Sequence, residues 1–174
     1  AAAGGFTSFA GNNTLFGYDS DFNYAAAGTG SETASWTFTG LAAGNYEVSV
    51  TWVEFSNRAT NAPYTIYDGA SQVGSSILIN QELAPAADHV EGGEPFQIIS
   101  ASVSITSGTL VVELTNNANG YIIADAVRIE LITPAITSAE SLSESSLTES
   151  SAINVYDRYH LASGGLASGS IGDV

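Results

Sequence analysis

The chain has 174 residues, of which 18 are acidic and three are basic, so its formal net charge is -15 at pH 7. This charge argues against nucleic acid as a partner, because phosphates need basic side chains, and against docking on anionic lipid. The length is enough for one domain of ordinary size plus an extension. Hydrophobic residues make up 44% of the chain, so a core can form. No apolar run is long enough to span a membrane.

The chain contains no cysteine, which excludes disulfides, thiol catalysis and cysteine-based zinc sites. It contains no methionine either, so either a leader was removed or the segment was cut from a longer protein, and we favour a removed export signal. That interpretation predicts an extracellular or cell-surface protein. The sequence indicates no cofactor. Because an acidic surface attracts cations, a structural Ca²⁺ ion stays open.

Two polar patterns occur near the beginning of the chain, after a short apolar segment at residues 6–10 that we expect to be a strand. Asn12 begins an Asn-Asn-Thr triplet, the acceptor pattern for N-glycosylation. Asp19, Asp21 and Asn23 then place oxygen-bearing side chains at alternate positions, as in the first half of a Ca²⁺ loop.

The second half of such a Ca²⁺ loop does not follow, because Gly30 stands where the bidentate glutamate should be. A polar surface loop and a different Ca²⁺ geometry therefore both stay open, and we favour the surface loop.

The clearest strand patterns lie at residues 33–39 and 46–53, where apolar and polar side chains alternate. A short connection bounded by glycines joins the two segments, so we expect them to form an antiparallel pair. Trp36 and Trp52 fall on the apolar faces, which predicts that both lie in the core. Surface aromatics are expected instead among five tyrosines: Tyr18, Tyr24, Tyr64, Tyr67 and Tyr121.

Further strand-like segments follow, separated by turn signals, and residues 82–95 are expected to form a loop. The last strand of the domain is expected at residues 121–131. About eight short antiparallel strands, with no convincing helix before residue 132, predict an all-β sandwich or jelly roll.

Several segments together carry a family resemblance. They are Ala34–Phe38, Gly44–Val48 with Thr51-Trp52, Asn57–Tyr67, Asn80-Gln81, and Leu114–Asn116 through Ala124–Arg128. With them, residues 6–132 resemble the golvesin/xanthan-lyase carbohydrate-binding-like domain. The resemblance implies an extracellular β-sandwich module, often appended to larger secreted proteins, and carbohydrate as a ligand class. It assigns no sugar-contact residue to this chain.

Four residues of these segments are expected to form a structural motif: Arg58, Asn61, Asp125 and Arg128. Asp125 and Arg128 lie three residues apart on a strand, so their side chains point to opposite faces and need not pair. We expect Asp125 to be partly buried and to accept hydrogen bonds from the 57–61 loop or from Arg58. A role in fixing this loop is favoured over ligand binding.

The sequence offers no catalytic constellation. The two histidines, His89 and His160, lack a motif partner, and no nucleophile motif is present. Carboxylate pairing is spatial and escapes a sequence pattern, but most acidic residues lie in loops or near the C-terminus, which favours solvation. We therefore expect a protein that is not an enzyme.

Residues 133–174 form a Ser-rich acidic C-terminal arm beyond the predicted domain at residues 1–132. The arm contains a strand-like segment with four apolar side chains on one face: Ile153, Val155, Tyr159 and Leu161. Sheet edges accept such segments through main-chain hydrogen bonds. Added to a neighbouring copy, the segment would make a head-to-tail contact that propagates as a filament.

Two functions follow from the two interpretations of the arm. We predict a structural subunit of a self-assembling extracellular filament, with copies of itself as partners and the arm docking by strand addition. The alternative is a non-catalytic carbohydrate-binding module of a larger secreted enzyme, with a polysaccharide as its partner and the arm as a linker.

Overall fold

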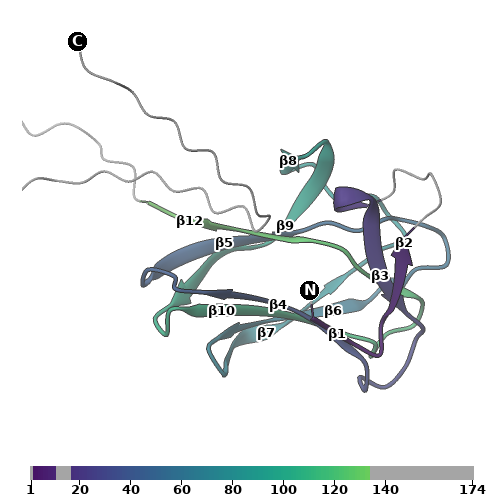
Figure 1. The fold of residues 1–174 in the computed structure, drawn as a ribbon, viewed down its shortest axis with the longest axis horizontal. Helices are drawn as coiled ribbons and strands as arrows, with labels where there is room; N and C mark the ends of the chain where they lie inside the picture. Colours follow the sequence, from purple (N-terminus) through teal and green to yellow (C-terminus); the bar gives the residue numbers. More distant parts are fainter. Residues whose placement is uncertain (1, 11–16, 134–174) are drawn as a thin grey trace, which may run out of the picture. The chain divides into compact units, whose positions relative to one another are not determined.

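The computed structural model of the chain describes residues 2–10 and 17–133 (Figure 1). The contacts of the chain divide it into Ala1–Pro134 and Ala135–Val174, and only the first unit contains described residues. Within the described ranges, no helix has the length and apolar character needed to cross a bilayer. The predicted arm and its four apolar residues lie outside these ranges, as does Asn12.

Twelve strands in three sheets make up the described part, with one short 3-10 turn, η1 (Tyr18–Ser20). Sheet A has the order β1 (Ala2–Gly4), β4 (Thr33–Thr39), β10 (Thr109–Thr115), β6 (Ala62–Asp68) and β7 (Ser71–Ile79). Sheet C has the order β12 (Val127–Leu131), β5 (Gly44–Val50), β9 (Glu94–Ile105) and β8 (His89–Glu91). The smaller sheet B has the order β11 (Ile122–Ala124), β3 (Asp21–Ala25) and β2 (Thr7–Ala10).

Sheets A and C are the two layers of a β-sandwich, and β2 and β3 lie at one end of it (Figure 1). Every strand pair within the sheets is antiparallel. The predicted fold class is therefore confirmed. The described part has more strands than the eight expected, because several short strands lie in segments that the sequence pattern indicates as loops.

The core is built from the alternating apolar faces that the sequence pattern predicted. Sheet A contributes buried side chains from β4, β6 and β10, and sheet C contributes them from β5 and β9; the largest fully buried ones include Tyr64, Leu110, Leu114, Val48, Val50 and Ile105. Trp36 and Trp52 are also buried, as predicted. Each indole finds a backbone acceptor: Trp36 Nε1 donates to the carbonyl of Asp125 at 3.3 Å, and Trp52 Nε1 to that of Leu83 at 2.9 Å.

The expected pairing of residues 33–39 with 46–53 is wrong. β4 pairs with β1 and β10 in sheet A, whereas β5 pairs with β9 and β12 in sheet C. The short connection between them therefore passes from one layer to the other. The physical reason is that both strands have one strongly apolar face, and stacking these faces across the core buries both.

The expected last strand at residues 121–131 is two strands. β11 pairs with β3 in sheet B, and β12 pairs with β5 in sheet C. The break falls at Asp125 and Ala126, where the carbonyl of Ala126 accepts a hydrogen bond from the N–H of Thr51 at 3.1 Å. The chain changes sheets here, which a continuous β-branched pattern does not reveal.

Two smaller expectations also differ from the structure. Residues 82–95 are not all loop, because β8 and the first residues of β9 form a hairpin. Tyr64 is not a surface aromatic, since it is only 1% exposed. Its side chain lies in the core, 6.4 Å from Trp36 between ring centroids, and burial raises the pKa of its hydroxyl well above the ordinary value.

Buried amide side chains connect the sheets and loops. Gln81 is fully buried; its Nε2 donates to the carbonyl of Ile123 at 2.8 Å and to the Tyr64 hydroxyl at 3.2 Å, and its Oε1 accepts from the N–H of Ile123 at 2.9 Å. The backbone N–H of Gln81 donates to the carbonyl of Ala59 at 2.8 Å. One residue thus joins β6, β11 and the β5–β6 loop.

Replacing Gln81 by leucine tests this connection. The variant leaves the N–H and carbonyl of Ile123 and the Tyr64 hydroxyl buried without their partner, so we expect the free energy of unfolding to fall by about 3 kcal/mol or more. Urea denaturation followed by circular dichroism measures the change. Gln72→Leu, at an exposed position of β7, is the matched control and should change stability by less than about 0.5 kcal/mol. Equal losses in the two variants would contradict the assigned role.

Candidate functional site

The four predicted motif residues do not converge on one site. Arg58 lies in the β5–β6 loop, and Asn61 lies at the end of that loop. Asp125 lies at the break between β11 and β12, and Arg128 lies on β12. The structure places them in three separate environments.

Asn61 lies in hydrogen-bonding contact with a second loop and not with Asp125. Its Oδ1 accepts a hydrogen bond from the N–H of Asn119 at 2.9 Å, and Asn119 in turn accepts from the N–H of Thr60 at 2.9 Å. These bonds fasten the β5–β6 loop to the β10–β11 loop. Gly120 allows the close approach, because a Cβ atom there would lie 2.5 Å from the carbonyl oxygen of Arg58.

Arg58 does not reach Asp125, so that part of the expectation is wrong. Its Nη1 donates to Asn57 Oδ1 at 2.9 Å, and its Nε donates to the carbonyl of Val53 at 3.4 Å. The guanidinium carbon lies 5.8 Å from the centroid of the Phe55 ring, within range for a cation–π interaction. The Arg58 side chain therefore contacts residues of its own loop, including the Phe55 ring.

One exposed aromatic ring lies beside this arginine, and a second exposed aromatic residue is bridged to it through the backbone. Phe55 is 62% exposed and Tyr121 is 42% exposed. Arg58 and Tyr121 form an isolated parallel bridge, in which the N–H of Tyr121 donates to the carbonyl of Asn57 at 3.1 Å and the N–H of Ala59 donates to the carbonyl of Tyr121 at 2.7 Å. The ring of Tyr121 also meets that of Tyr24 edge-on, with centroids 6.4 Å apart. We call Tyr24, Phe55, Arg58 and Tyr121 the aromatic surface.

The aromatic surface combines features that suit a polar ring-shaped ligand. Exposed aromatic faces stack on the apolar faces of such rings, and Arg58 with the exposed Asn57 offers hydrogen-bonding groups at the edge. Tyr24 and Tyr121 were expected at the surface, but Phe55 was not singled out. Its signal was an aromatic residue in a polar loop, outside any alternating pattern.

A second polar region surrounds Asp125. Both of its carboxylate oxygens accept from the N–H of Tyr18, at 3.1 and 3.2 Å. Burial, reinforced by the charges of Glu94, Asp21 and Asp19, raises the pKa of Asp125 to about 7, against the lowering effect of the Tyr18 hydrogen bond.

Next to this carboxylate lies a pocket of about 260 Å³ that is lined by Gly17, Asp19, Ser20, Gly92 and Glu94. Asp19 and Asp21, two of the three Ca²⁺ candidates, thus share a region with Asp125 and Glu94. The third, Asn23, lies on β3 opposite Ser8 and Ala124. Carboxylate oxygens are the ligands that Ca²⁺ prefers, and the prediction of a structural Ca²⁺ stays a prediction.

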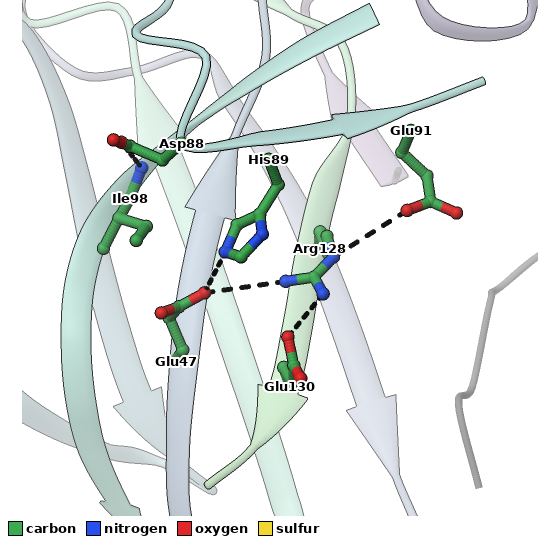
Figure 2. A network of polar contacts seen from close by, with 7 residues as sticks. All are labelled: Glu47, Asp88, His89, Glu91, Ile98, Arg128 and Glu130. Carbon is green, nitrogen blue, oxygen red and sulfur yellow. Dashed lines mark hydrogen bonds and ion pairs between the residues drawn. The ribbon is translucent and has the colours of Figure 1, made fainter. Parts of the chain in front are cut away.

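Arg128 belongs to a charged cluster on the outer face of sheet C, which sequence patterns did not indicate (Figure 2). Its guanidinium pairs with Glu130, lies 3.5 Å from Glu47 Oε1 and lies 4.0 Å from Glu91 Oε2. His89 Nε2 lies 2.5 Å from the same oxygen of Glu47. The ion-pair partners of Arg128 among the described residues are thus glutamates, and Asp125 is not among them. The contributing strands β5, β8 and β12 are far apart in sequence, so only the fold brings these residues together.

Comparison with known proteins supports the resemblance that the sequence segments carried. The sequence model of the Golvesin C-terminal domain family matches residues 10–131. No curated protein matches the chain.

Solved structures add two likenesses. A xanthan lyase from Paenibacillus is similar at 24% identity and a TM-score of 0.57, over 76% of this chain and 12% of the lyase chain. A CBM35 module from Cellvibrio japonicus Abf62 is similar at 15% identity and a TM-score of 0.40, over 72% of this chain and 91% of that chain. The chain thus corresponds to a small part of the lyase, and that likeness supports the sandwich fold.

The raised pKa of Asp125 predicts a pH dependence of stability. The folded chain holds a proton on Asp125 up to about pH 7, whereas an ordinary aspartate releases it near 3.8, so stability falls as the pH rises between these values. Asp125→Asn keeps an acceptor for Tyr18 but removes the charge.

We expect the stability of Asp125→Asn relative to the wild type to increase from pH 4 to pH 8, by up to about 4 kcal/mol. Urea denaturation at a series of pH values measures this difference. Glu82→Gln removes an exposed loop carboxylate instead and should show little of this dependence. If the difference in unfolding free energy between Asp125→Asn and the wild type does not change with pH, the raised pKa of Asp125 is contradicted.

Proposed function

The chain belongs to the Golvesin C-terminal domain family, and we propose on this premise that it is a non-catalytic carbohydrate-binding module of a larger extracellular protein. The aromatic surface binds the polysaccharide. The observation that carries the proposal is two exposed aromatic residues next to Arg58: Phe55, whose ring lies 5.8 Å from the guanidinium carbon, and Tyr121, whose backbone is hydrogen-bonded to the Arg58 loop.

The construction of this surface supports binding by preformed groups. The backbone bridge between Arg58 and Tyr121 and the amide bonds of Asn61 and Asn119 fix both loops to each other. A ligand that stacks on fixed rings loses less free energy to ordering the protein than one that binds mobile loops.

The net charge of -15 favours a neutral polysaccharide over an anionic one. The likeness to part of a xanthan lyase supports a module that accompanies other domains, because the chain corresponds to only 12% of that lyase. The family membership and this likeness also support an extracellular location. They favour the binding module over a filament subunit.

The filament interpretation stays a prediction, since it depends on residues 153–161, which lie outside the described ranges. Deletion of residues 133–174 separates the two proposals. For a binding module we expect native material without polymers in negative-stain micrographs, and unchanged sugar binding after the deletion. Polymers that disappear on deletion would support the filament instead.

Alanine variants test the aromatic surface. We expect Phe55→Ala and Tyr121→Ala each to weaken binding to a neutral polysaccharide by about tenfold, since one aromatic contact contributes about 1 kcal/mol or more. Retention on insoluble cellulose, chitin and β-glucan identifies the ligand, and calorimetry with its soluble oligomers measures the dissociation constant. Xanthan, which is anionic, should bind more weakly.

The matched control is Phe9→Ala. Phe9 is also 42% exposed, but it lies on β2 and stacks on Phe22, with centroids 4.9 Å apart. This variant should bind as the wild type does. If Phe55→Ala and Phe9→Ala bind alike, the surface is misassigned; if no polysaccharide is retained, the proposed function is wrong.

A further inference from the structure

We propose that Glu47, His89 and Glu130 bind one divalent transition-metal ion, of the Zn²⁺ class, on the outer face of sheet C. The site is separate from the aromatic surface and does not depend on the proposed function. Its three ligands come from β5, β8 and β12, so the ion would join the β8–β9 hairpin to the two strands beneath it (Figure 2).

The geometry of the three side chains suits a single ion. One ligand atom from each of the three lies within 4.8 Å of the others. Ligands at about 2.1 Å from Zn²⁺ lie about 3.4 Å apart in tetrahedral geometry, so small side-chain rotations are enough.

The charges of the cluster favour a divalent ion. Glu47, Glu91 and Glu130 carry three negative charges against one on Arg128, so the cluster has a formal charge of -2 when His89 is neutral. The side chains are partly exposed, from 18% for Arg128 and 20% for Glu47 to 34% for Glu91 and 42% for Glu130. Solvent screens part of the excess negative charge, and a divalent ion brings the sum to zero.

An unpartnered polar atom gives independent support. Ser49 is fully buried, and its Oγ has no hydrogen-bond partner in the described structure. Ser49 stands opposite Arg128 in the β5–β12 register, and Glu47 stands opposite Glu130, so these side chains share one face of the sheet. The face of the sheet that carries the three ligands therefore also carries a buried hydroxyl without a partner.

Arg128 is compatible with the ion. It pairs with one oxygen of Glu130 and lies near one oxygen of Glu47, which leaves the second oxygen of each carboxylate outside these contacts. Glu47 Oε1, the oxygen near Arg128, also faces His89, and Glu130 is held on the other side of the guanidinium. Arg128 therefore acts as a positioning residue, as hydrogen-bond partners of metal ligands commonly do.

The ligand set selects the class of ion. Ca²⁺ takes six to eight oxygen ligands, and two carboxylates with one imidazole do not supply them. An imidazole nitrogen with two carboxylate oxygens suits Zn²⁺ and its neighbours in the first transition row.

Calorimetric titration of the whole, chelator-treated chain with Zn²⁺ tests the proposal. We expect one ion per chain, and at least about tenfold weaker binding for His89→Ala and for Glu130→Gln, since even partners of ligands contribute tenfold or more. The control His160→Ala removes the other histidine, and Asp19→Asn alters the acidic pocket; both should bind as the wild type does.

Co²⁺ provides a readout that a purely structural ion-pair cluster does not produce. Its visible absorption spectrum should show four-coordinate binding in the wild type and lose that signature in His89→Ala. Circular dichroism checks that each variant is folded. If His89→Ala is unfolded, Glu130→Gln takes its place as the test variant. Absence of Zn²⁺ binding by the wild type, or unchanged binding by the folded ligand variants, would overturn the proposal.

Discussion

The hydrogen bonds of the buried Gln81 side chain are the interaction on which much of the structure depends. They join Tyr64 of sheet A to Ile123 of sheet B, and the Gln81 backbone holds Ala59 of the β5–β6 loop. Ala59 in turn donates to Tyr121. A single buried amide thus connects the core with both loops of the aromatic surface, because each group there needs a partner away from water.

The fold class could be predicted from the sequence because the alternation of apolar and polar residues along a strand indicates which of its faces is buried. Trp36 and Trp52 were placed in the core on this basis, and both are buried. Alternation does not report which strand is the neighbour, so the pairing of β4 with β5 was mistaken. It also does not mark a change of sheet, and residues 122–131 therefore looked like one strand.

The candidate sites were less predictable, because they depend on contacts between distant segments. Asp19 and Asp21 were identified from local spacing, but Asp125 and Glu94 join them only in the fold. Glu47, His89 and Arg128 had no pattern in common. The only local signal of Phe55 is an aromatic residue in a polar loop, whereas Tyr121 was among the five tyrosines expected at the surface.

Gly120 has a consequence for how this surface can change. Its missing side chain lets the two loops touch through their backbones, so the frame of the aromatic surface does not depend on which side chains project from it. Phe55 and Asn57 project from that frame and are exposed. Exchange of these two side chains therefore leaves the backbone contact at Gly120 intact.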